Sequence, residues 1–81
     1  MKTVIKLFAK ARDLVGTSDI ELDLTDSATA ADLRIKLGEA FPALRPILPS
    51  LLVAVGTDYA APATRVGGRT DLAVFPPVSG G

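Results

Sequence analysis

One segment of the chain has the spacing of a long amphipathic helix, and this feature restricts the fold more than any other. Four apolar residues recur on one face of that helix: Leu33, Leu37, Ala40 and Phe41. They follow a capping-box pattern formed by Thr29 and Asp32. Pro42 ends the helix, and two further prolines make the connection up to residue 50 irregular. One such helix can cover only one face of one sheet.

Strand patterns lie on both sides of this helix. A period-two pattern over residues 20–24 predicts a strand with one face in water, near a sheet edge. Pro62 allows at most a short edge strand over residues 59–65. A short helix over residues 9–15 is ended by Gly16, which suits the left-handed position after a helix. The other predicted strands cover residues 3–8, 51–55 and 72–75, with turns at residues 56–58 and 66–69.

The order of these elements is strand, strand, helix and then further strands, within 81 residues. This order predicts an α+β fold, the β-grasp (ubiquitin-like) roll, in which a mixed sheet has one main helix on one face. Its first and last strands would lie side by side in parallel at the sheet centre. A ferredoxin-like fold would need a second full helix, for which the proline-rich residues 42–49 are a poor candidate. We expect a β-grasp domain over residues 1–75 and a flexible Gly-Gly tail over residues 76–81.

The composition excludes several classes of function. The formal net charge is zero and the nine basic residues are scattered, so nucleic acid is not expected as a partner. The chain has no cysteine and no histidine, which excludes a disulfide, a thiolate metal site and the commonest general base. No segment has the apolar run of a signal peptide or the length of a membrane span, so we expect a cytoplasmic protein that binds no membrane.

The side chains do not predict a self-contained active site. The nine acids show no pairing that their spacing would single out, and they are best interpreted as solvated or capping residues. Gly67 and Gly68 do not open a helix, so they do not predict a phosphate-binding loop. We therefore expect no bound cofactor and no metal, and a partner would have to supply the acid, the base and the electrophile for any reaction.

The reactive group that remains is the carboxylate of Gly81. Pro76 and Pro77 stiffen the exit from the last strand, and Gly80 and Gly81 have no side chain, so this tail suits a narrow channel in another protein. A carboxylate is a poor electrophile at neutral pH. It would first have to be activated, for instance as an acyl-adenylate formed with ATP on another enzyme, and sulfur would then displace AMP to leave a terminal thiocarboxylate.

Strand alternation predicts where a partner would dock. If the side chains of residues 5, 7, 72 and 74 face the helix, Phe8 and Phe75 must lie on the opposite face of the sheet, which the helix does not cover. Exposed apolar patches usually mark interaction sites. We interpret Phe8, Phe75 and Tyr59 as a docking surface beside the tail, with simple packing of these rings on one another as the alternative.

Three segments resemble the small subunit of molybdopterin synthase. They are residues 7–16, residues 51–55, and the Phe-Pro-Pro-Val-Ser-Gly-Gly sequence of residues 75–81. The resemblance spans the whole chain, and the last segment is its most selective part. It implies a β-grasp fold and a sulfur carrier of molybdenum cofactor biosynthesis.

The reaction implied by this resemblance needs several partners. An E1-like enzyme would use ATP to adenylate Gly81, a sulfur donor would convert it to the thiocarboxylate, and the sulfur would pass to cyclic pyranopterin monophosphate. The transfer would take place in the large subunit of a heterotetramer, where Val78, Ser79 and Gly80 would line the channel. The chain would then be the sulfur-donating subunit of a two-subunit sulfurtransferase, without catalytic side chains of its own.

The sequence departs from the usual pattern of that family at two turns. Gly56 stands where asparagine is usual, and residues 69–71 are Arg-Thr-Asp in place of Gly-Asp-Glu. These changes alter the chemistry of the turns and the charge that a partner would meet. Three alternatives stay open: the sulfur carrier of thiamine biosynthesis, a ubiquitin-like modifier joined to lysines of target proteins, and a plain interaction domain.

Overall fold

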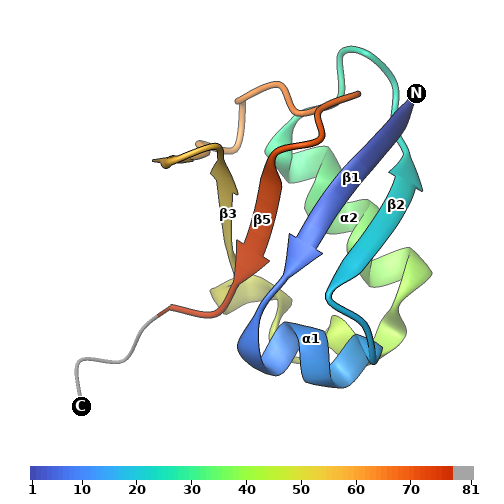
Figure 1. Cartoon of the computed structure of the whole chain (residues 1–81), viewed down its shortest axis with the longest axis vertical. Coiled ribbons are helices and arrows are strands. Elements are labelled where there is room, and N and C mark those ends of the chain that lie inside the picture. Colours follow the sequence, from blue (N-terminus) through green and yellow to red (C-terminus); the bar gives the residue numbers. More distant parts are fainter. Residues whose placement is uncertain (78–81) are drawn as a thin grey trace.

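The computed structural model describes residues 1–77, in which one sheet packs with two helices (Figure 1). The strands are β1 (Lys2–Leu7), β2 (Asp19–Asp23), β3 (Leu52–Val55), β4 (Asp58–Tyr59) and β5 (Leu72–Phe75). The helices are α1 (Ala9–Val15) and α2 (Ala30–Ala40), followed by the short 3-10 helices η1 (Pro42–Leu44) and η2 (Leu48–Ser50). The order of strands in the sheet is β2-β1-β5-β3-β4.

The first and last strands are parallel neighbours in the interior of the sheet. Leu7 pairs with Val74, whereas the other neighbouring strands run antiparallel. This arrangement confirms the predicted β-grasp fold, and β2 lies at an edge, as its alternating pattern indicates. The N–H of Phe8 donates to the carbonyl of Val74 over 3.1 Å. The start of α1 therefore lies beside the end of β5.

α2 begins at the predicted capping box and covers one face of the sheet (Figure 1). The hydroxyl of Thr29 accepts a hydrogen bond from the N–H of Asp32 at 3.3 Å, and the Asp32 carboxylate accepts one from the N–H of Thr29 at 2.9 Å. Leu33 and Leu37 on its inner face are fully buried. The helix ends at Ala40 because the proline two residues later cannot continue it.

The core lies between α2 and the sheet. Alternate residues of β1 and β5 supply its centre, and each is at most 2% exposed: Ile5, Leu7, Leu72 and Val74. This is the alternation that the sequence predicts. Thr3 is a buried polar residue of β1, and its hydroxyl accepts a hydrogen bond from the N–H of Gly68 at 2.9 Å, which offsets the cost of burying it.

The boundaries of β1, β2 and β3 differ from the sequence-based prediction by one residue, and that of β4 differs more. Phe8 lies outside β1 because it is the extended N-cap of α1, and Ala9, with a φ of 53°, turns the chain into that helix. The short edge strand is β4, which begins at Asp58, inside the predicted turn. Arg65 forms only an isolated bridge with the residue before α2, because Pro62 interrupts the segment.

Candidate functional site

α2 packs on one face of the sheet and leaves the other uncovered, and we call this second face the open face (Figure 1). Its side chains belong to the residues that alternate with the core positions along each strand. Over β3, β4 and β5 they are mainly apolar: Leu52, Ala54, Tyr59, Ala73 and Phe75. Over β1 and β2 they are mainly charged: Lys2, Lys6, Asp19, Glu21 and Asp23. The open face therefore has an apolar half at the exit of β5.

Two of the predicted aromatic residues form a pair on this apolar half. The rings of Tyr59 and Phe75 have centroids 6.1 Å apart and planes inclined by 46°. Tyr59 is 73% exposed, so its outer face is free to contact another molecule. With Ala54, Gly56 and Thr57, the two rings border a shallow pocket of about 170 Å³. An exposed aromatic pair beside a pocket offers a partner side chain apolar surface to bury.

Phe8, the third predicted aromatic residue, lies apart from this pair. Its side chain is 43% exposed, as the sequence predicts. Its backbone hydrogen bond to Val74 places it next to the end of β5. Among residues 1–77, however, the ring contact is that between Tyr59 and Phe75. Phe75 is half-buried, and therefore less exposed than predicted, because Tyr59 packs against it.

Leu52, Ala54 and Ala73 complete the apolar half, and the sequence-based prediction did not include them. Leu52 pairs with Phe75 across β3 and β5. Ala54 pairs with Ala73 on one side and with Tyr59 on the other. The signal that would have identified these residues is the strand register, since residues paired directly opposite one another share one face of the sheet.

β5 leads directly into the predicted tail. Pro76 is half-buried and Pro77 is exposed, and both follow Phe75, the last residue of β5. The other residues predicted to contact a partner or to react lie outside the described residues: Val78, Ser79, Gly80 and Gly81. The structure therefore positions the start of the tail, beside the apolar half of the open face.

Two turns depart from the usual sequence of the molybdopterin synthase small subunit, one at Gly56 and one at residues 69–71, and they lie side by side in the structure. Gly56 has a φ of 60°, and its N–H donates to the carbonyl of Asp71 over 3.0 Å. The guanidinium of Arg69 donates two hydrogen bonds to the Asp71 carboxylate, at 2.8 and 2.6 Å. These bonds hold the pKa of the Asp71 carboxyl below its usual range and raise the pKa of Arg69. The departures thus form one unit, which joins the turn after β3 to the start of β5.

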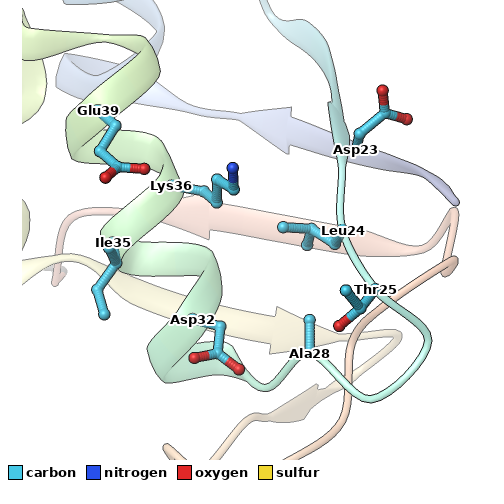
Figure 2. Close-up of a pocket in the computed structure, with 8 residues that line it drawn as sticks. All are labelled: Asp23, Leu24, Thr25, Ala28, Asp32, Ile35, Lys36 and Glu39. Atoms are coloured by element: carbon cyan, nitrogen blue, oxygen red, sulfur yellow. The ribbon is translucent and has the colours of Figure 1, made fainter.

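Within residues 1–77, no cluster of three or more acidic side chains is arranged to hold a metal ion. In the same part of the chain, every helix is too short or too polar to cross a membrane. A pocket of about 420 Å³ lies between α2 and the end of β2 (Figure 2), at the sheet edge opposite to β4.

Known proteins match this chain over nearly its whole length. The solved structure of SAMP1 from Haloferax volcanii matches with a TM-score of 0.85 and 29% identity, and the match covers 100% of both chains. The molybdopterin synthase sulfur carrier subunit of Dictyostelium discoideum is 34% identical over 80 residues, which cover 95% of this chain and 93% of that protein. The molybdopterin synthase sulfur carrier subunit of Arabidopsis thaliana is 32% identical over 77 residues, which cover 95% of this chain and 80% of that protein.

These relatives confirm the resemblance to the small subunit of molybdopterin synthase. The likeness to SAMP1 agrees with the β-grasp sheet described above. Residues 5–81 match the model of the ThiS family, from β1 through to the Gly-Gly sequence. Because this match covers almost the whole sequence, the chain belongs to the ThiS family.

Proposed function

We propose that this protein is a sulfur carrier and the small subunit of a molybdopterin synthase. The observation that carries the proposal is the 34% identity to a molybdopterin synthase sulfur carrier subunit, over 95% of the chain. The apolar half of the open face also supports it. A carrier has to be recognised by other proteins close to the group that it delivers, and this surface lies at the exit of β5.

The working atom in this proposal is the carboxyl carbon of Gly81. An E1-like enzyme transfers AMP from ATP to the carboxylate, which forms a mixed anhydride and releases pyrophosphate. Sulfur at the oxidation level of sulfide, supplied by a donor, then attacks the carbonyl carbon. The bond to AMP breaks, AMP leaves and a thiocarboxylate remains. The partners supply the side chains for these steps.

The thiocarboxylate gives its sulfur to cyclic pyranopterin monophosphate within the large subunit. The sulfur displaces an oxygen from a carbon of that substrate, and water then cleaves the bond between the sulfur and the carbonyl carbon, which leaves Gly81 as a carboxylate. Each thiocarboxylated carrier that binds the large subunit delivers one sulfur, so two binding events are needed for the two sulfurs of the dithiolene. In the proposed heterotetramer, the residues Val78, Ser79 and Gly80 enter the channel of the large subunit, behind Gly81. Pro76 and Pro77 would hold this segment away from the sheet.

The apolar half of the open face is the proposed docking surface for the large subunit. Tyr59 and Phe75 would act as aromatic anchors, with Leu52 beside Phe75 on the same face of the sheet. The activating enzyme needs access to the same terminal residue. Both partners would therefore use this one surface, and they would bind to it one at a time.

An intact mass measurement tests the proposed function. The purified chain is incubated with an E1-like activating enzyme, ATP and a sulfur donor, and a known carrier is treated in parallel. We expect the chain to gain the mass difference between one sulfur and one oxygen, and a variant without Gly81 to gain nothing at that position. An unchanged mass for the natural sequence, with the known carrier converted, would contradict the proposal.

Covalent modification of proteins is a second candidate function. It is favoured by the likeness to a solved structure described as small archaeal modifier protein 1 from Haloferax volcanii, at 30% identity and a TM-score of 0.77. In this case a lysine amine, rather than sulfur, would attack the activated carbonyl carbon of Gly81. Conjugates of higher mass after incubation with a cell extract and ATP would distinguish this function from sulfur transfer.

A further inference from the structure

β2 is an edge strand with backbone groups that point away from the sheet. The N–H of Leu24 donates to the carbonyl of Met1 at 3.0 Å, and the nitrogen of Met1 donates to the carbonyl of Leu24 at 2.9 Å. In an antiparallel ladder such mutual bonds recur at every second residue, so the backbone N–H and C=O groups of Leu22 also point toward β1. The N–H and C=O groups of Glu21 and Asp23 must then point outward. Within residues 1–77 these outward groups have no strand beside them, and an added strand can pair with them.

A groove follows this edge between β2 and α2 (Figure 2). Two adjoining pockets of about 420 Å³ and about 300 Å³ form it, and Asp23, Lys36 and Glu39 border both. Figure 2 shows that Leu24 and Lys36 point toward one another across the groove. Ile35 also borders it and is 62% exposed, although no part of the proposed sulfur transfer uses this side chain. The groove therefore offers apolar surface that the isolated chain leaves in water.

The charged groups around the groove and the edge are mostly acidic. The carboxylates are those of Asp19, Glu21, Asp23, Asp32 and Glu39. Fewer positive groups lie near them. Lys36 borders the groove, Lys6 is the partner of Asp19 in the pairing of β1 with β2, and Lys2 lies 3.6 Å from Glu21 in an exposed ion pair. The N-terminal amine of Met1 is hydrogen-bonded to the carbonyl of Leu24. The excess of negative charge favours a partner segment with basic side chains.

A strand added to β2 would continue the alternation of the sheet. Every second side chain of that strand would lie over the groove, beside Leu24 and Ile35, where apolar groups are favoured. The intervening side chains would lie beside Asp19, Glu21 and Asp23 on the open-face side, where basic groups are favoured. We propose that this edge binds an extended segment of another protein in which apolar and basic residues alternate.

A second copy of this chain is a poorer occupant of the edge. Pairing of β2 with β2 of another copy would bring the acids of one strand close to the acids of the other, and like charges across strands are destabilising. Protection against self-pairing is by itself a sufficient reason for charges on an edge strand. It does not explain the exposed Ile35 or the groove beside it, whereas a basic and apolar segment accounts for both.

Titration with a synthetic peptide tests this proposal. The isotope-labelled chain is mixed with a blocked peptide of about eight residues in which valine and lysine alternate, a length typical of strands. We expect amide shift changes in β2 and in residues 35–39, and slower hydrogen exchange at the amides of Glu21 and Asp23. A peptide in which valine alternates with glutamate should bind at least about tenfold more weakly.

Variants separate the two parts of the proposed site. Ile35→Ser removes apolar surface from the groove and should weaken binding of the lysine peptide by about tenfold. The matched control is Ala43→Ser, an exposed position in η1, which should leave the affinity unchanged. Glu21→Lys combined with Asp23→Lys should reverse the preference, so that the glutamate peptide becomes the tighter ligand.

Several results would overturn the proposal. They include the absence of binding, shift changes confined to the surface around Phe75, and equal affinities for the two peptides. A variant carrying both Glu21→Lys and Asp23→Lys that still binds the lysine peptide more tightly would also overturn it. Self-association of the chain through β2 without any peptide would favour a second copy and would also overturn it. None of these measurements depends on sulfur transfer, so the proposed function can fail or hold independently.

Discussion

The ring of Tyr59 reaches across β3 to contact Phe75 on β5, with 6.1 Å between the ring centroids. The residue between them in the sheet is Ala54, which pairs with Tyr59 on one side and with Ala73 on the other. The small side chains of the two alanines leave room for this diagonal contact. The ring of Tyr59 on the edge strand β4 therefore packs against the ring of Phe75. This contact fixes the position of Phe75, the last residue before the tail.

Phe75→Ala should weaken association with the large subunit by about 2 kcal/mol, as loss of a central aromatic anchor does. Titration calorimetry with the purified large subunit measures this change. The matched control is Leu72→Ala in the same strand, where the side chain is 2% exposed and its loss should cost about 2–5 kcal/mol of stability. An unchanged affinity for Phe75→Ala, or a thermal melt in which Phe75→Ala is the less stable variant, would contradict the assignment of the two faces.

Gly67→Ala should destabilise the fold by about 3 kcal/mol, because the added Cβ would collide with the backbone carbonyl oxygen of Thr25. Gly16→Ala is the control, because it makes the same substitution at a position where no neighbouring atom is close. There a Cβ meets nothing within 4 Å, and only the positive φ of 92° opposes it, at a cost of about 1 kcal/mol. Chemical denaturation of both variants gives the comparison, and equal losses of stability would show that the contact at Gly67 is not as close as described.

Thr29→Ala should lower the free energy of unfolding by about 1 kcal/mol, because α2 would lose the side-chain half of its capping box. Thr29→Ser keeps the hydroxyl and should retain most of the stability. Urea denaturation measures both changes. A serine variant as unstable as the alanine variant would indicate that the hydroxyl does not cap the helix.

The Arg69–Asp71 pair predicts a specific dependence on pH. Because the folded pKa of Asp71 lies below its unfolded value, the pair contributes stability above about pH 4, and this contribution is lost as the pH falls through the folded pKa. A carboxyl titration by NMR should place the pKa of Asp71 below that of an ordinary aspartate. Arg69→Met should raise it toward the ordinary value, and both effects should shrink at high salt, since the pair is exposed. Identical titration curves for the two proteins would exclude the proposed coupling.

Short-range patterns in the sequence predict much of this fold. Period-two alternation places Ile5, Leu7 and Leu72 on the core side of the sheet, and the structure buries all three. The capping box of α2 is another local pattern, since both partners lie within one turn of helix. The parallel pairing of β1 with β5 follows from the order of the elements, because a single helix leaves few ways to arrange these strands.

Features that depend on pairing between distant segments could not be predicted in this way. The register of β3 against β5 places Leu52 beside Phe75, and no local spacing specifies that register. The groove beside β2 likewise depends on how α2 packs on the sheet next to the end of β2. The adjacency of Gly56 and Asp71 arises from the same long-range pairing. Sequence patterns therefore predicted which face is open, but not which residues complete it.

A single-turnover assay with cyclic pyranopterin monophosphate tests the proposed role most directly. The purified thiocarboxylated chain is mixed with this substrate, with and without the large subunit, and the dithiolene product is measured. The chain has no histidine and no cysteine, and within residues 1–77 its acids form no metal-binding cluster. We therefore expect product only when the large subunit is present. Dithiolene formed at a comparable rate by the thiocarboxylated chain alone, or no dithiolene even with the large subunit, would contradict the role of sulfur-donating subunit.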